Sequence, residues 1–107
     1  MKLMIILSGK HAETNWNALR LANLAISKGD TVSVFLIGEG VEYHKDSSSQ
    51  FNIKGQMNTF LQSKNAEIIA CETCMDIRKQ QGSKECPAGG IEDLYNLITE
   101  SDKVLTF

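Results

Sequence analysis

Four short runs of apolar residues constrain the fold of this chain more than any other feature. They are Leu3–Leu7, Thr31–Ile37, Ala66–Ala70 and Val104–Phe107. A strand with one face in water alternates apolar and polar residues, whereas these runs are apolar nearly throughout. They therefore predict short strands buried on both faces, which is the pattern of a parallel sheet covered by helices.

Segments with helical character separate these strands. The expected helices are Glu13–Lys28, Ile53–Leu61, Cys71–Gln81 and Ile91–Ile98. We expect Thr14 to cap the start of the first helix, because its hydroxyl can accept a hydrogen bond from a free backbone N–H. Gly29 and Gly82 are natural places for helices to end. The polar segment 38–50 is predicted to be mainly loop, with His44 at the surface, and a further strand near 83–87 is left open.

Strands that alternate with helices indicate one α/β domain over residues 1–107, with a mostly parallel sheet of four to five strands and helices on both faces. The length of 107 residues suits a single core and leaves no room for two. The chain carries 11 Lys and Arg residues against 13 Asp and Glu. This near-neutral balance gives no electrostatic reason to expect nucleic acid, because phosphate binding needs an excess of positive side chains.

The N-terminal apolar run is shorter than a secretory signal, which needs roughly 7–15 apolar residues. No stretch approaches the ~20 apolar residues of a membrane span. We therefore expect a cytoplasmic protein whose three cysteines are reduced.

Two of the cysteines lie close together in the sequence, where a strand is predicted to end. Cys71 follows the third strand directly, and the carboxyl ends of parallel strands are where ligands and reactive groups gather. Backbone N–H groups at the start of the next helix would favour a Cys71 thiolate. Cys74 lies on the same side of that turn, and Arg78 adds a positive charge, while Glu72 opposes the effect. The direction of the pKa shift at Cys71 is not determined by these residues.

Three other interpretations of the cysteines stay open at this point. Cys71 and Cys74 could be small buried residues without chemistry. They could form half of a zinc site with Cys86 as a third ligand, although the chain has no second CxxC and no paired histidines. They could form a thioredoxin-like dithiol, although the only proline, Pro87, lies beside Cys86.

The turn after the first strand is a weaker candidate. Ser8-Gly9-Lys10-His11 is not a phosphate-binding loop, because one glycine does not form the required cradle. It is predicted to lie at the same sheet edge as Cys71, so His11 is a candidate supporting residue, with a solvated loop as the plainer alternative.

Four stretches together resemble the DsrE/DsrF-like family of sulfur-relay proteins, which includes the TusD-type carriers. They are Leu19-Arg20-Leu21-Ala22 with Gly29–Leu36, Gly38-Glu39-Gly40-Val41, Ala70-Cys71-Glu72-Thr73-Cys74 with Arg78, and Gly90–Leu94 leading to Asp102–Phe107. Taken together, these stretches span nearly the whole chain. The resemblance implies a small three-layer α/β/α sandwich and assembly as a homo-oligomer, commonly a trimer or hexamer.

For function, the resemblance implies that Cys71 accepts sulfur as a persulfide from a protein donor and passes it to a protein acceptor. Cys74 matches a second cysteine found in many relatives, and Cys86 has no role that the family assigns. Cys74 or Cys86 could attack a Cys71 persulfide or protect Cys71 from over-oxidation. We expect no prosthetic group and no metal. The alternatives are a non-catalytic oligomeric binding or scaffold module with structural cysteines, or a zinc or redox CxxC site.

Overall fold

The computed structural model describes residues 1–107, which form an α/β structure with a five-stranded sheet. Its elements are, in chain order, β1 (Lys2–Leu7), α1 (Ala12–Ser27), β2 (Thr31–Leu36), the 3₁₀ helix η1 (Gly38–Glu42), α2 (Ile53–Leu61), β3 (Ala66–Cys71), α3 (Glu72–Ile77), β4 (Ala88–Gly89), α4 (Ile91–Glu100) and β5 (Lys103–Thr106).

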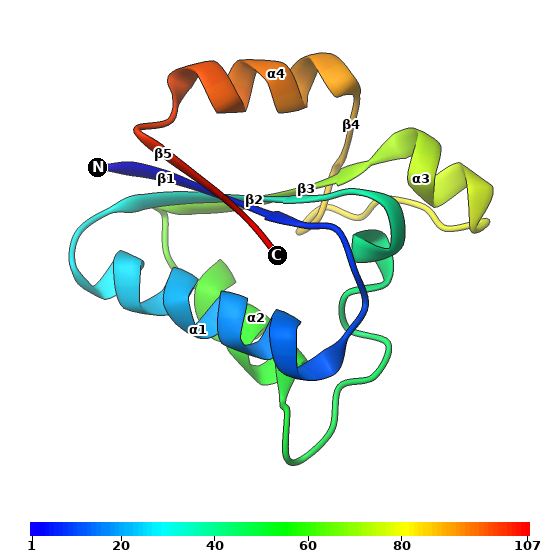
Figure 1. Ribbon diagram of the computed structural model, residues 1–107, viewed down its shortest axis with the longest axis horizontal. Helices are drawn as coiled ribbons and strands as arrows, with labels where there is room; N and C mark the ends of the chain where they lie inside the picture. The colour runs from blue at the N-terminus through cyan, green and yellow to red at the C-terminus, as the bar shows by residue number, and fades with distance from the viewer.

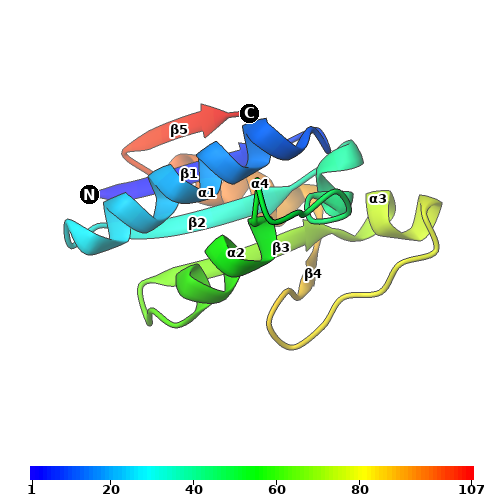
Figure 2. The ribbon, with the colours of Figure 1, turned by 90° about the horizontal axis from the view of Figure 1, so that it is seen from below.

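The sheet is parallel throughout and has the order β4-β3-β2-β1-β5. Helices α1 and α2 cover one face of the sheet, α4 covers the other, and α3 extends beyond the edge where the strands end (Figure 1). Figure 2 shows the strands side by side, with β5 and the short β4 at the two edges. The expected three-layer sandwich is confirmed.

The core lies where the central strands meet the helices. Its largest fully buried side chains include Phe35, Phe60, Met4, Ile5 and Leu19. The runs in β1 and β2 are apolar because helices cover both of their faces. By contrast, all four residues of the edge strand β5 are exposed. No helix of the molecule is long and apolar enough to span a bilayer.

The start of α1 differs from the sequence prediction. The helix begins at Ala12, and its N-cap is His11, whose Nδ1 lies 3.5 Å from the backbone nitrogen of Thr14. The prediction of Thr14 as the cap was therefore wrong. The imidazole nitrogen acts as the acceptor that a Ser, Thr or Asp side chain usually supplies.

The segment after β3 also differs. Helix α3 ends at Ile77 instead of continuing to Gln81, because Lys79 adopts the left-handed conformation (φ 56°) expected of Gly82, and the Gln80 N–H bonds the Met75 carbonyl. The residues 83–87 form no strand. Strand β4 comes just after them, at Ala88–Gly89.

Candidate functional site: a dithiol and a separate thiol-lined cavity

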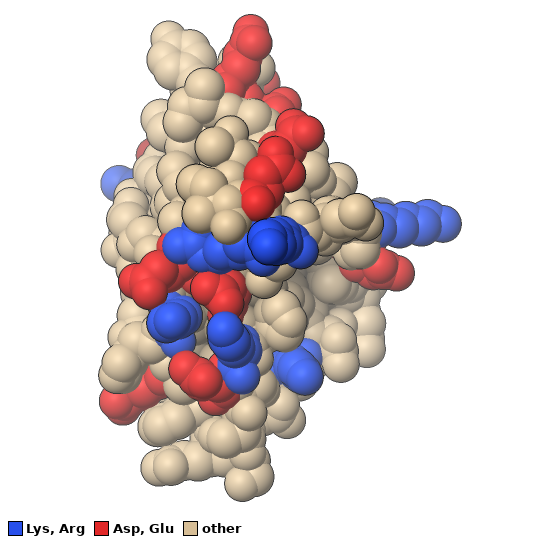
Figure 3. Space-filling model, turned by 90° about the vertical axis from the view of Figure 1, so that its right-hand side faces the viewer, with Lys and Arg blue, Asp and Glu red and all other residues tan.

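The candidate site lies at the edge of the sheet where β2 and β3 end, beside η1 and α3. The face in Figure 3 looks onto this end of the molecule, and basic and acidic side chains are interspersed across its middle. Two ion pairs lie close to the site, the exposed Lys10–Glu39 bridge at 3.7 Å and the Lys45–Glu42 bridge at 2.9 Å. Neither positive nor negative charge therefore dominates the electrostatic field at the site.

Cys71 is the last residue of β3 and the N-cap of α3, as its place in the sequence predicted. Its side chain is only 8% exposed. Burial and the hydrogen bond with the Cys74 side chain raise the pKa of the Cys71 thiol, although the backbone N–H groups of Cys74 and Thr73 act in the opposite direction. The helix start thus lowers the pKa as expected, but burial outweighs it.

Cys74 is half-buried and lies between Cys71 and η1. Its sulfur accepts a hydrogen bond from the Gly38 N–H at 3.2 Å. The side-chain hydrogen bond with Cys71 joins the two thiols into one dithiol. This backbone donor fixes the Cys74 side chain against the start of η1.

Two glycines allow η1 to reach the dithiol. Gly38 has a φ of +59°, a conformation that side chains with a Cβ rarely adopt. Gly40 is buried against the end of β1, and a Cβ placed there would overlap the Leu7 carbonyl. The Gly38-Glu39-Gly40 sequence is therefore required by the close approach of η1 to the sheet.

Arg78 holds α3 to η1. Its Nε donates to Glu42 Oε1 at 3.1 Å, and its Nη1 donates to the Cys74 carbonyl at 3.0 Å. The guanidinium charge is thus paired with a half-buried carboxylate and is not directed at a thiol. Arg78 therefore positions the turn that carries Cys74.

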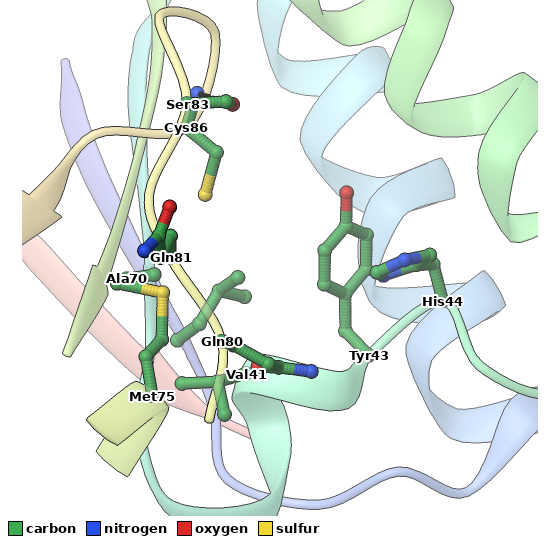
Figure 4. A pocket seen from close by; sticks show the side chains of 10 residues that line it. Val41, Tyr43, His44, Ala70, Met75, Gln80, Gln81, Ser83 and Cys86 are labelled. Carbon is green, nitrogen blue, oxygen red and sulfur yellow. Dashed lines mark hydrogen bonds between the residues drawn. The ribbon is translucent and has the colours of Figure 1, made fainter. Parts of the chain in front are cut away.

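Cys86 lies in a different place from the dithiol. It lines an open cavity of about 410 Å³ whose wall includes neither Cys71 nor Cys74. Side chains alternate along a strand, and the cavity contacts Ala70, so Cys71 belongs to the opposite face of β3. Figure 4 shows the Cys86 sulfur directed into the cavity, across from the ring of Tyr43. Burial raises the pKa of the Cys86 thiol.

The sequence prediction missed two residues of this cavity, Tyr43 and His44. His44 was expected at the surface, but it is half-buried and packs against Tyr43 with ring centroids 4.7 Å apart. A signal was present, because segment 38–44 follows β2 at the same edge as Cys71. His11 is exposed, caps α1 and does not line the cavity.

The zinc interpretation required Cys86 to join the other two cysteines. His, Cys, Asp and Glu side chains form no group of three or more that could hold a metal ion. The dithiol is therefore a pair without a third ligand from this chain.

Comparisons with known proteins give matches over most or all of the chain. The chain matches the DsrE/DsrF-like family over residues 1–107. It is 32% identical, over 102 residues, to an uncharacterized protein of Methanopyrus kandleri, covering 89% of this chain and 83% of that protein. The crystal structure of the ychN protein from E. coli superposes with a TM-score of 0.81, at 24% identity and with complete coverage of both chains. This last likeness concerns the fold alone.

Proposed function

The chain belongs to the DsrE/DsrF-like family, whose members usually act in sulfur relay, and from this premise we propose that it carries sulfur as a persulfide on Cys71. The observation that carries the proposal is the dithiol itself. Cys71 ends β3 next to Cys74, the Thr73 and Cys74 N–H groups at the start of α3 act to lower the pKa of its thiol, and the Gly38 N–H donates to the Cys74 sulfur. A cytoplasmic location, where thiols stay reduced, suits this chemistry.

The transfer step exchanges one sulfur between two thiolates. The Cys71 thiolate attacks the outer sulfur of a donor persulfide, a Cys71–sulfur bond forms, and the donor leaves as a thiolate. The same step in reverse passes the sulfur to an acceptor thiolate. Because the pKa of Cys71 is raised, little thiolate is present at neutral pH, but the thiolate that forms is strongly nucleophilic.

Cys74 is proposed as the second thiol. Its thiolate can attack the inner sulfur of the Cys71 persulfide, which releases hydrosulfide and leaves a Cys71–Cys74 disulfide. Atoms and charge balance without an external oxidant, because the persulfide sulfur is the group that is reduced. Cys86 lies in the cavity away from this pair, so Cys74 takes the role that the sequence left open between the two.

The test is persulfide loading of the full chain from inorganic polysulfide, followed by intact mass. The wild type should gain the mass of one sulfur atom, and Cys71→Ser should not. Cys86→Ser is the matched control and should load normally, while Cys74→Ser should load and then hold its sulfur longer. Undiminished loading of Cys71→Ser would contradict the proposal.

A second candidate is a scaffold module whose cysteines only fill space, and the burial of Cys71 favours it. Labelling with a small alkylating reagent separates the two. A carrier should label at Cys71 in the folded state, with a rate that climbs with pH and is still climbing at pH 9.0, because burial raises the pKa above that value. Labelling of Cys71 only after denaturation supports the scaffold.

We also propose that the chain assembles into a homo-oligomer, as a trimer or hexamer, and works with protein donors and acceptors of sulfur. Ile91, Tyr95 and Ile98 recur on α4 at intervals of four and three and are 71%, 66% and 41% exposed. Val104 and Leu105 of β5 are exposed too. Apolar residues grouped this way mark contact surfaces. Sedimentation should find an assembly that Tyr95→Glu weakens; a monomeric wild type at micromolar concentration would refute the proposal.

A further inference from the structure

The cavity beside Cys86 combines an apolar floor with a ring of polar groups. Its floor is formed by four apolar side chains, namely Leu36, Val41, Ala70 and Met75. Its volume of about 410 Å³ lies within the range of pockets that hold small organic molecules, roughly 300–1,000 Å³. The floor explains how a small ligand would be held, and the polar rim explains how it would be oriented.

The polar groups converge on the cavity from two segments. Tyr43 and His44 directly follow η1, whereas Gln80, Gln81 and Ser83 come from the chain between α3 and β4 (Figure 4). These side chains make no hydrogen bonds to one another in Figure 4. The Nδ1 of His44 is buried without any hydrogen-bond partner. A buried polar atom without a partner is unfavourable, so His44 would gain from a ligand that completes its hydrogen bonds.

The cavity is uncharged. No Lys, Arg, Asp or Glu side chain lines it. Its three titratable groups are each shifted toward the neutral form, chiefly by burial: the pKa of Tyr43 rises to about 12, the pKa of Cys86 rises, and the pKa of His44 falls. A charged ligand would lose its hydration here without gaining an opposite charge, which is costly.

We infer that this cavity is a binding site for a small uncharged molecule that carries a carboxamide on a flat ring. The amides of Gln80 and Gln81 each offer a donor and an acceptor, which matches the paired donor and acceptor of a carboxamide. Tyr43 and Met75 provide an aromatic face and a polarisable thioether for the ring. This binding site goes beyond sulfur carriage, because neither Cys71 nor Cys74 lines it and Cys86 contributes only a neutral side chain to its wall.

Nicotinamide and nicotinate form a matched pair of probes. They share one ring and differ only in a neutral amide against a carboxylate. Each is titrated into the full-length, isotope-labelled protein and followed by two-dimensional amide NMR up to about 10 mM, which reaches the millimolar dissociation constants expected of so small a ligand. Nicotinamide should shift the amides of segments 41–44 and 80–86, and nicotinate should bind at least about tenfold more weakly.

The substitution Gln81→Met replaces one amide side chain with an apolar side chain of nearly equal size, at an exposed position. It should weaken nicotinamide binding by about threefold to tenfold, the effect of one lost hydrogen bond. Gln50→Met, at an exposed position outside the cavity, is the matched control and should change nothing. Equal binding of the two probes, shifts outside the cavity, no saturable shifts at all, or no effect of Gln81→Met would each overturn the inference. Persulfide loading on Cys71 is measured separately and is not expected to depend on these outcomes.

Discussion

Two cysteine environments lie at the same end of the sheet and use the same two elements, η1 and α3, yet they differ in what surrounds the sulfur. Burial raises the pKa of both Cys71 and Cys86. At Cys71, the backbone N–H groups of Thr73 and Cys74 and the Cys74 side chain also act on the pKa. At Cys86, burial is the only cause of the shift. A position at the functional edge of a parallel sheet therefore makes a thiol available, and its hydrogen-bond partners decide what it can do.

The two environments are separated by the pleat of β3 and linked through η1. Gly38, at the start of η1, donates to the Cys74 sulfur, while Val41 near its end and Tyr43 just after it line the cavity. Substitutions in η1 should therefore disturb both regions, and substitutions beyond it should disturb one.

The largest expected effect is that of Gly40→Ala. The added methyl overlaps the Leu7 carbonyl and forces η1 away from the sheet, at a cost of about 2–3 kcal/mol in unfolding free energy. Urea unfolding measures this loss. Thiol labelling at Cys74 and Cys86 should accelerate together in the variant. Gly9→Ala is the control, because a Cβ there meets no atom within 4 Å. Acceleration at only one of the two cysteines would break the proposed link.

A smaller effect, confined to the cavity, is expected of Tyr43→Phe. Burial, aided by nearby Cys86, raises the pKa of Tyr43 from 10.0 to about 12. Since the unfolded chain ionises first, the stability due to the neutral phenol is complete below pH 10 and is lost as the pH rises toward 12. Between pH 10 and pH 12, the unfolding free energy of Tyr43→Phe should therefore fall by about 2 kcal/mol less than that of the wild type. Tyr95→Phe, at a position 66% exposed, should follow the wild type.

The smallest effect, confined to the dithiol side, is expected of Arg78→Met. It removes the hydrogen bond to the Cys74 carbonyl and the bridge to Glu42, at a cost of about 1 kcal/mol in unfolding free energy. Lys10→Met removes an exposed pair and should change stability by less than about 0.5 kcal/mol. If Arg78→Met altered the cavity amides in NMR as strongly as those around Cys74, the two regions would be one site.

Much of the fold was predictable from local patterns. The apolar runs located the three central strands because strands covered on both faces need no alternation. The spacing at 53–61 matched α2 at both ends. The end of α3 was not predictable, because Lys79 takes the left-handed conformation that composition favours at Gly82. Strand β4 has only two residues, which is too short to leave a pattern.

The sequence alone determined the central parallel strands, the place of Cys71 at the end of β3 and that of Cys74 in the helix that follows, because periodicity and chain order act locally. Only the tertiary structure decided the direction of the Cys71 pKa shift, the Gly38 donor to Cys74 and the separation of Cys86 into its own cavity. Each of these depends on burial or on contacts between segments more than 30 residues apart, such as the 36 between Gly38 and Cys74. Residue type and spacing carry no record of which such segments pack together.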